Sequence, residues 1–358
     1  MIKLLYKNLL KPFLFLFDAE RVHDWFVNIG EFAGKFVFLR WMVQLIYGKP
    51  ESNTTIAGDG VKYNRPVILA AGFDYNARLL EILYYVGFGG EEIGSVTALP
   101  CPGNKSPRLK RMIKSRSLIV NKGLKNEGVE AVIKRIKKAK IPKNYVYGIS
   151  IAKTNSDCTV DLEDGINDYF QTFKRVNEEN VGSFITINIS CPNVFGGENF
   201  AHPERLNLLL EKLRTITSGK PMYLKLPINV SKEEIFEMID VGLKYDIQGV
   251  IIGNLNKDYK DTANLVASEM PEKYEGGLSG AACKKLSTDL IRAVKNKYHK
   301  KITIIGCGGI LSVEDAKEKF EAGADLIQLI SGMIFEGPHL MNQINDWYFS
   351  EWIGRKDQ

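Results

Sequence analysis

From about residue 66 onward, short apolar runs rich in β-branched residues alternate with longer segments whose apolar positions recur at helical spacing. Eight runs are candidate strands: PVILAAG (66–72), GEEIGSVT (90–97), YVYGISI (145–151), FITINIS (184–190), MYLKLPI (222–228), GVIIGN (249–254), ITIIGCG (302–308) and DLIQLIS (325–331). Their almost continuous apolar character is typical of strands buried on both faces, as in a parallel sheet. Because helical patterns lie between most of them, the sequence predicts an α/β fold, a (β/α)8 TIM barrel.

Two of the intervening helices have recognisable ends. The segment SKEEIFEMIDVGLKY (231–245) begins with Ser231, a suitable N-cap, and Glu234 three residues later completes a capping box. Gly323 is a typical C-terminal stop for the helix that precedes it.

Residues 1–50 do not follow this alternation and are predicted to form a helical extension, with the barrel over 51–358. Two interpretations stay open. The helices could form a lid packed on the barrel, or an amphipathic pair that also touches a membrane surface, as their Phe, Leu, Trp and Lys content allows. No apolar run reaches the ~18 residues that a spanning helix needs. Lys3, Lys7 and Lys11 interrupt the first apolar stretch, which also lacks a signal-peptide cleavage site.

Composition narrows the function classes. The net charge of +6 is spread along the 358 residues, and the basic run KRIKKAKIPK (134–143) is interpreted as a solvated helix end, so no nucleic-acid partner is expected. The five cysteines form no C-x-x-C pair and the four histidines no ligand-spaced pair. We therefore expect neither a disulfide framework nor a metal site.

Active sites of (β/α)8 barrels lie at the C-terminal ends of the strands. Here those ends are rich in Gly and Asn and poor in carboxylates, which disfavours a hydrolase built on paired carboxylates. They comprise residues 71–74, 95–97, 188–193, 225, 254, 306–309 and 331–332. The glycines of the last two tips could hold a phosphate with backbone N–H groups, or could simply form tight turns.

Two side chains at these strand ends are candidates for chemical roles. Lys225 lies in an otherwise apolar strand, so it must be paired or must face a ligand, and it would suit the pyrimidine edge of a reduced flavin. Cys191 follows the strand 184–190 and could accept a proton at the barrel mouth, or could be a small buried apolar residue. Uncharged Asn188, Asn193 and Asn254 would suit a planar heterocycle.

Several motifs together resemble one family. LAAGFD, EIGSVT, PGNKSPRLKR, INISCPN, LKLPI, GGLSG, IIGCGGI and LIQLISG occur in the order found in dihydroorotate dehydrogenases. FDAERVHDW is similar to the helical extension of the class 2, quinone-reducing, membrane-associated branch. The resemblance implies an FMN-binding barrel that oxidises dihydroorotate to orotate in pyrimidine biosynthesis. A base takes the C5 proton, the C6 hydride goes to FMN N5, and a quinone reoxidises the flavin. It also implies a peripheral membrane protein, at the cytoplasmic face of the inner membrane if the source is bacterial.

The resemblance assigns roles by matched position. Cys191 falls on the base position, and Lys225 joins it as a catalytic candidate. The FMN positions are Ala71, Gly72, Tyr75, Ser95, Ser150, Asn188, Lys225, Gly253, Gly280, Gly308, Gly309, Ile330 and Ser331. The substrate positions are Asn121, Lys122, Gly123, Leu124, Asn188, Asn193 and Asn254. His23 and Arg111 match positions that line the quinone entrance.

The chain departs from the family pattern at the site. Class 2 members usually carry serine as the base, whereas cysteine in this place is a class 1 feature. Tyr75 stands where class 2 has a lysine, and Ser95 where class 1 has one. Further departures are Val120 for asparagine, Ser150 for asparagine, Gly253 for threonine and Ile330 for tyrosine. We hypothesise that Lys122 or Lys125 restores the missing charge beside the anionic substrate.

Other functions stay open at this point. The chain could be a related FMN oxidoreductase acting on another planar heterocycle or cyclic amide, which the missing lysine and Val120 allow. It could also be a flavin-binding or partner-binding protein without catalysis, although retention of Cys191, Lys225 and Asn193 argues against this. A sulfite- or phosphate-handling barrel without flavin is a weaker alternative.

Overall fold

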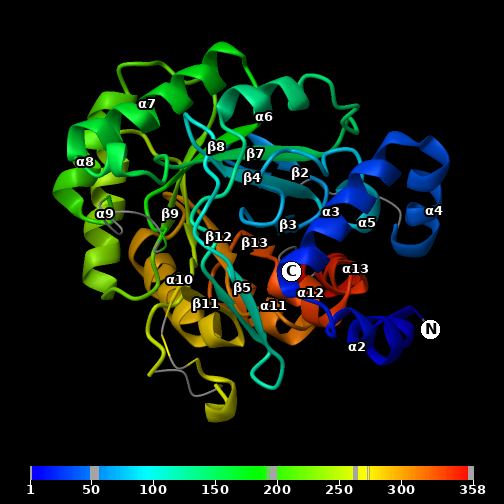
Figure 1. Ribbon diagram of the computed structural model, residues 1–358. Helices are drawn as coiled ribbons and strands as arrows, with labels where there is room; N and C mark the ends of the chain where they lie inside the picture. Colours follow the sequence, from blue (N-terminus) through cyan, green and yellow to red (C-terminus); the bar gives the residue numbers. More distant parts are fainter. Residues whose placement is uncertain are drawn as a thin grey trace.

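Eight parallel strands close into a barrel in this computed structural model, which describes residues 2–48, 56–191, 193, 200–260, 265–271, 273 and 275–353. The strands are β3 Val67–Leu69, β4 Gly90–Val96, β7 Val146–Ile151, β8 Phe184–Asn188, β9 Met222–Leu226, β10 Gly249–Ile252, β12 Thr303–Cys307 and β13 Leu326–Leu329. Around the barrel their order is β10-β12-β13-β3-β4-β7-β8-β9. Every strand coincides with one of the eight predicted runs, so the predicted TIM barrel is confirmed (Figure 1).

Helices on the outside of the barrel bury the outer face of these strands. They are α5 Leu83–Val86, α6 Val129–Ile136, α7 Leu162–Glu178, α8 Pro203–Leu213, α9 Lys232–Lys244, α10 Lys284–Tyr298, α11 Val313–Glu321, α12 Ser331–Glu336 and α13 His339–Trp347. The predicted capping box of Ser231 and Glu234 is present at the start of α9. Gly323, with φ +112°, follows the end of α11 as expected.

Two small sheets outside the barrel were not predicted. The strands β1 Ile56–Gly58 and β2 Val61–Tyr63 form a hairpin. The strands β5 Leu109–Met112, β6 Ser117–Val120 and β11 Gly277–Gly280 form an antiparallel sheet in the order β11-β6-β5. Because β6 leads directly into residues 121–125, this second sheet positions the predicted substrate loop.

The N-terminal extension is helical, as predicted. It comprises α1 Ile2–Leu5, a π-helical turn Tyr6–Leu10, α2 Lys11–Leu14, α3 Ala19–Lys35 and α4 Val37–Tyr47. Asp18 caps α3 by accepting hydrogen bonds from the backbone N–H groups of Glu20 and Arg21, both at 3.0 Å. The Tyr6 hydroxyl and the Lys11 ammonium donate to carbonyls of α12. The extension therefore lies beside α12 and α13 (Figure 1).

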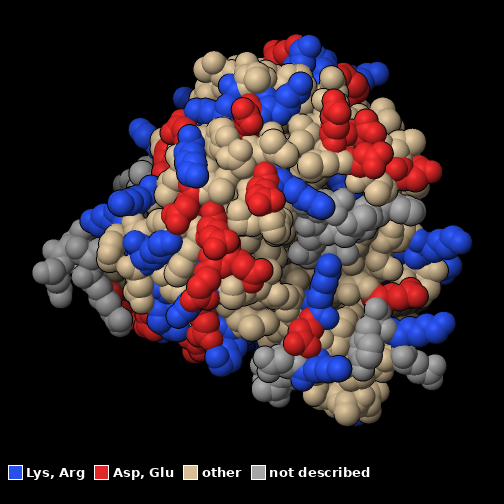
Figure 2. Space-filling view, turned by 90° about the vertical axis from the view of Figure 1, so that its left-hand side faces the viewer, with Lys and Arg blue, Asp and Glu red and all other residues tan. Residues whose placement is uncertain are grey.

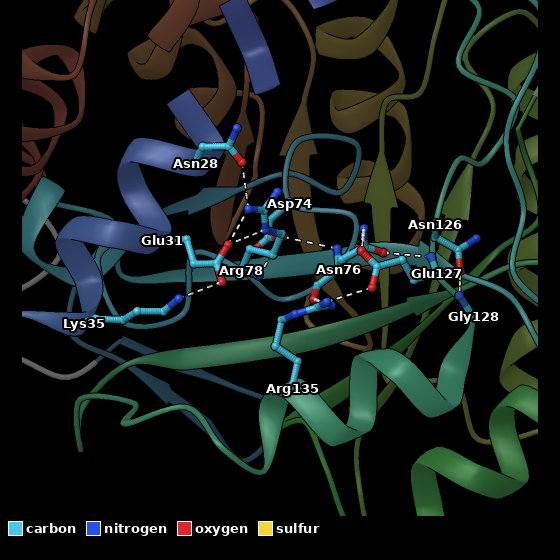
Figure 3. A network of polar contacts seen from close by, with 10 residues as sticks. All are labelled: Asn28, Glu31, Lys35, Asp74, Asn76, Arg78, Asn126, Glu127, Gly128 and Arg135. Carbon is cyan, nitrogen blue, oxygen red and sulfur yellow. Dashed lines mark hydrogen bonds and ion pairs between the residues drawn. The ribbon is translucent and has the colours of Figure 1, made fainter. Parts of the chain in front are cut away.

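A polar network fixes α3 on the rim of the barrel (Figure 3). Arg78, which follows β3, donates to Glu31 Oε2 at 2.6 Å and to Asn28 Oδ1 at 2.8 Å, both on α3. The buried Asp74 carboxylate orders the same turn by accepting from the N–H of Arg78 at 3.0 Å. Further hydrogen bonds link this region to α6. Asn76 donates to the Glu127 carboxylate, and Arg135 of α6 donates to Asn76 O and to the same carboxylate.

On the face turned toward the viewer in Figure 2, basic and acidic side chains are interspersed. Within the part of the chain that the structure describes, none of the helices combines the length and apolar character required to cross a bilayer.

Lys319 ties α11 to the first turn of α10 and should make stability depend on pH. Its ammonium is fully buried and donates to Lys284 O, Ser287 Oγ and Thr288 Oγ1 at 2.7–3.0 Å. Burial lowers the pKa of Lys319 from 10.5 to about 7. Between these values the unfolded chain holds a proton that the folded protein has lost, so this group's contribution to the free energy of unfolding rises with pH.

We therefore predict that the stability difference between wild type and Lys319→Met shifts in favour of wild type as pH rises from 7 to 10. The slope should be at most about 1.4 kcal/mol per pH unit. Urea unfolding of both proteins across this pH range measures the difference, and a pH-independent difference would contradict the argument.

Candidate active site

A cavity of about 460 Å³ opens at the C-terminal ends of the barrel strands and continues beneath the N-terminal helices. Many of the predicted site residues line it together. They are His23, Ala71, Gly72, Tyr75, Ser95, Arg111, Lys122, Gly123, Leu124, Asn188, Cys191, Asn193, Lys225, Asn254 and Ile330. Residues far apart in the sequence thus meet in one space large enough for ligands.

Lys225, which lines the cavity, forms a buried ion pair with Glu92. Lys225 Nζ lies 3.3 Å from Glu92 Oε2, and the two residues are 4% and 0% exposed. The other oxygen of Glu92 has no hydrogen-bond partner among the described residues. Glu92 Oε2, the oxygen that faces Lys225, also accepts a hydrogen bond from Ala71 N–H at 3.3 Å. A lysine ammonium has three N–H donors, so Lys225 has donor capacity left for a ligand.

A chain of hydrogen bonds orients the amide side chains beside Lys225. Asn188 Nδ2 donates to Ser95 Oγ at 2.8 Å, and Ser95 Oγ lies 2.9 Å from Ser150 Oγ. Asn254 Nδ2 donates to Ser190 Oγ at 2.7 Å, and Ser190 Oγ donates to Lys225 O, also at 2.7 Å. Ser150 therefore does not line the cavity itself but supports Ser95, which does.

Cys191 lines the cavity and is partly exposed. Residues 192 and 194–199, which continue this loop, lie outside the described residues. Asn193 Nδ2 donates to Val120 O at 2.8 Å. Asn104 donates to Asn193 O at 3.1 Å and to Asn121 Oδ1 at 2.7 Å. Asn121 does not line the cavity, and Asn104 links it to Asn193, so the predicted substrate loop lies against the Cys191 segment.

The wall contributed by the N-terminal helices is largely apolar. His23 Nε2 lies 2.8 Å from Phe73 O, and its ring lies 5.2 Å from that of Tyr75. The Tyr75 hydroxyl is buried without a hydrogen-bond partner among the described residues. Arg111 of β5 donates to Phe17 O at 2.8 Å and so ties β5 to the segment between α2 and α3. His23 and Arg111 are the polar groups of this wall that the sequence predicted.

The remaining predicted FMN positions lie outside the cavity lining, at or next to the ends of neighbouring elements: Gly253, Gly280, Gly308, Gly309 and Ser331. The four glycines have φ between +74° and +135°, a region that disfavours other residues. A Cβ on Gly309 would lie 2.4 Å from Lys284 Cα. Ser331 Oγ lies 2.6 Å from the hydroxyl of Ser279, which lines the cavity.

A charged cluster lies beside the cavity, and the sequence predicted only some of its members. Glu20 of α3 pairs with Lys122 at 3.0 Å, Arg108 at 2.8 Å and Lys125 at 3.5 Å. Sequence reasoning proposed the two lysines but missed Glu20 and Arg108, and it also missed Glu92. For Glu92 a signal existed, because two opposite charges in apolar strands of one barrel are expected to pair.

Comparison with known proteins identifies relatives of this chain. A family model described as dihydroorotate dehydrogenase matches residues 53–348. The chain is 35% identical over 349 residues to the dihydroorotate dehydrogenase (quinone) of Christiangramia forsetii, covering 95% of this chain and 98% of that protein. It is 36% identical over 340 residues to the enzyme of the same name from Vibrio parahaemolyticus, covering 92% and 96%.

Among solved structures, DHODH from Eimeria tenella in complex with ferulenol matches with a TM-score of 0.77 at 23% identity, covering 95% of this chain and 93% of that one. This match shows the shared fold. The family model matches most of the chain, and the Christiangramia forsetii relative is 35% identical over 95% of it. The chain therefore belongs to the dihydroorotate dehydrogenase family.

Proposed function

We propose that this protein oxidises dihydroorotate to orotate with bound FMN and passes the electrons to a quinone. The observation that carries the proposal is the single cavity that joins Lys225, Cys191 and three asparagines to an apolar wall of N-terminal helices. The names of the relatives, dihydroorotate dehydrogenase (quinone), support it.

The residues present fit FMN. A Cβ on Gly72 would meet only Ile330 Cδ1, at 3.7 Å, so this backbone leaves open space for a flat ring. Ser95, Asn188 and Lys225 would hold the ring, and the strand-end glycines Gly308 and Gly309 would hold its phosphate. When bound, FMN supplies the hydride acceptor and the electron relay to the quinone.

Cys191 would remove the C5 proton of dihydroorotate, since it lines the same cavity as Asn188, Asn193 and Asn254, which would hold the ring. The asparagines donate and accept hydrogen bonds at the ring's amide edges without adding charge. Lys225 places a positive charge where negative charge develops during hydride transfer. The Asn104–Asn193 and Asn193–Val120 hydrogen bonds would keep Asn193 positioned beside the substrate ring.

The N-terminal helices would admit the quinone and contact a membrane. Large apolar side chains of this segment are exposed, among them Leu16, Val37, Phe38, Trp41 and Leu45. An amphipathic surface of this kind inserts into the interfacial layer of a bilayer. We propose peripheral attachment through this surface, at the cytoplasmic face of the inner membrane if the cell is bacterial, with the quinone entering past His23 and Arg111.

Replacing Phe38 and Trp41 together with serine should weaken binding to anionic phospholipid vesicles about tenfold or more, because both side chains are over half exposed, at 63% and 53%. Vesicle co-sedimentation measures this. Leu208→Ser, which changes an exposed apolar residue of α8, is the matched control and should bind like wild type. Equal binding by all three proteins would contradict the membrane assignment.

The whole proposal is tested by steady-state turnover of the purified flavoprotein with dihydroorotate and a short-chain ubiquinone in detergent. Quinone reduction that depends on dihydroorotate supports it. The buried Tyr75 in the cavity wall favours one alternative, a different reduced heterocycle, so dihydrouracil is assayed in parallel. Turnover with dihydrouracil alone would replace the proposed substrate.

A further inference from the structure

Three cations converge on the carboxylate of Glu20 at the edge of the cavity. Arg108 holds both oxygens, with Nη2–Oε1 at 2.8 Å and Nε–Oε2 at 3.1 Å. Lys122 Nζ lies 3.0 Å from Oε1 and Lys125 Nζ 3.5 Å from it. Asp24 adds a second carboxylate nearby, but its side chain is 50% exposed and is bonded to His23. The described residues thus leave one positive charge in excess at this place.

Of the three cations, Lys122 is the one best placed to meet a ligand. The residue is 8% exposed and lines the cavity, and its ammonium lies 5.6 Å from the centre of the Tyr75 ring. The Asn193–Val120 hydrogen bond holds its loop beside Cys191. Lys125 also lines the cavity but its side chain is 33% exposed, so solvent screens its charge more.

We infer that Lys122 receives the carboxylate of the substrate, and that Glu20 of α3 competes with that carboxylate for the same ammonium. The inference rests on the proposed function. A partly buried excess cation beside an otherwise apolar wall favours an anionic ligand. Binding of a carboxylate would draw Lys122 away from Glu20, so Glu20 sets how tightly the site holds its substrate and product.

The competition predicts effects of opposite sign. Lys122→Met should weaken orotate binding about 10- to 100-fold, since a charge-assisted hydrogen bond is lost. Glu20→Gln should tighten it several-fold, because the competing charge disappears while Gln can still accept a hydrogen bond from Arg108. Helix α3 should keep its position in this variant, because Arg78 binds it independently through Glu31 and Asn28 (Figure 3).

The measurement is the dissociation constant of orotate, obtained from the change in flavin absorbance on titration of each flavin-loaded protein. Uracil, which has the same ring without the carboxylate, is titrated in parallel and should bind all variants alike. Lys110→Met, an exposed lysine of β5, is the matched control and should bind orotate like wild type. Lys125→Met should show a smaller loss than Lys122→Met.

A cluster with only a structural role would weaken orotate binding in both variants and would weaken uracil binding equally, which would overturn the inference. Equal orotate affinity in wild type and Lys122→Met would overturn it while leaving the proposed function intact. A yellow wild-type protein that does not bind orotate would instead contradict the proposed function and remove the inference with it.

Discussion

Cys191→Ala is expected to slow reduction of the flavin by dihydroorotate about 10²- to 10⁴-fold, the usual contribution of a general base. Binding of orotate should change little, because the asparagines and not the thiol hold the ring. Anaerobic stopped-flow measurement of flavin absorbance, with dihydroorotate saturating, separates the rate from the affinity.

Two further variants sharpen this test. Cys191→Ser keeps an oxygen base at the same place and should recover part of the lost rate. Cys158→Ala removes an exposed thiol that does not line the cavity, and the flavin of this variant should be reduced as fast as in wild type. Full activity in Cys191→Ala would exclude this thiol as the proton acceptor.

Lys225→Met is expected to have the largest effect on the folded protein as well as on the chemistry. It leaves the Glu92 carboxylate, which is fully buried, without its cation. Breaking a buried pair by removing one partner costs about 3–5 kcal/mol. Flavin retention and the rate of flavin reduction should fall together with stability.

The double variant Lys225→Met/Glu92→Gln separates these effects. It removes the unpaired charge, so urea unfolding should show much of the lost stability restored. Flavin reduction should stay slow, since no cation then faces the developing negative charge. Recovery of the rate along with stability would show that Lys225 is only a structural residue.

The barrel could be predicted because the strands are predominantly apolar, with few polar residues among them, and such runs have few alternative locations in a globular fold. The sheet of β5, β6 and β11 escaped prediction for the opposite reason. Its strand Leu109–Met112 reads LKRM, in which charged and apolar residues mix over four positions. Only the pairing with Ser117–Val120 and Gly277–Gly280 makes it a strand, and pairing partners cannot be read from local pattern.

In the candidate site, too, the residues marked by local sequence pattern could be predicted, and those that depend on tertiary packing could not. Lys225 was found because a lysine in an apolar strand requires an explanation, and strand-end positions identified Cys191 and the asparagines. Glu20 was not found, because an acidic residue in the first turn of a helix is ordinary there. Its meeting with Lys122, 102 residues later, depends on how α3 packs across the rim.

The most direct test of the account is an anaerobic titration of the purified protein with dihydroorotate, followed through the flavin absorbance. The account predicts stoichiometric bleaching at modest concentrations, and return of the colour when a quinone is added. A protein that binds FMN and stays yellow at saturating dihydroorotate would contradict the proposed reaction and would point to a different substrate for the same barrel.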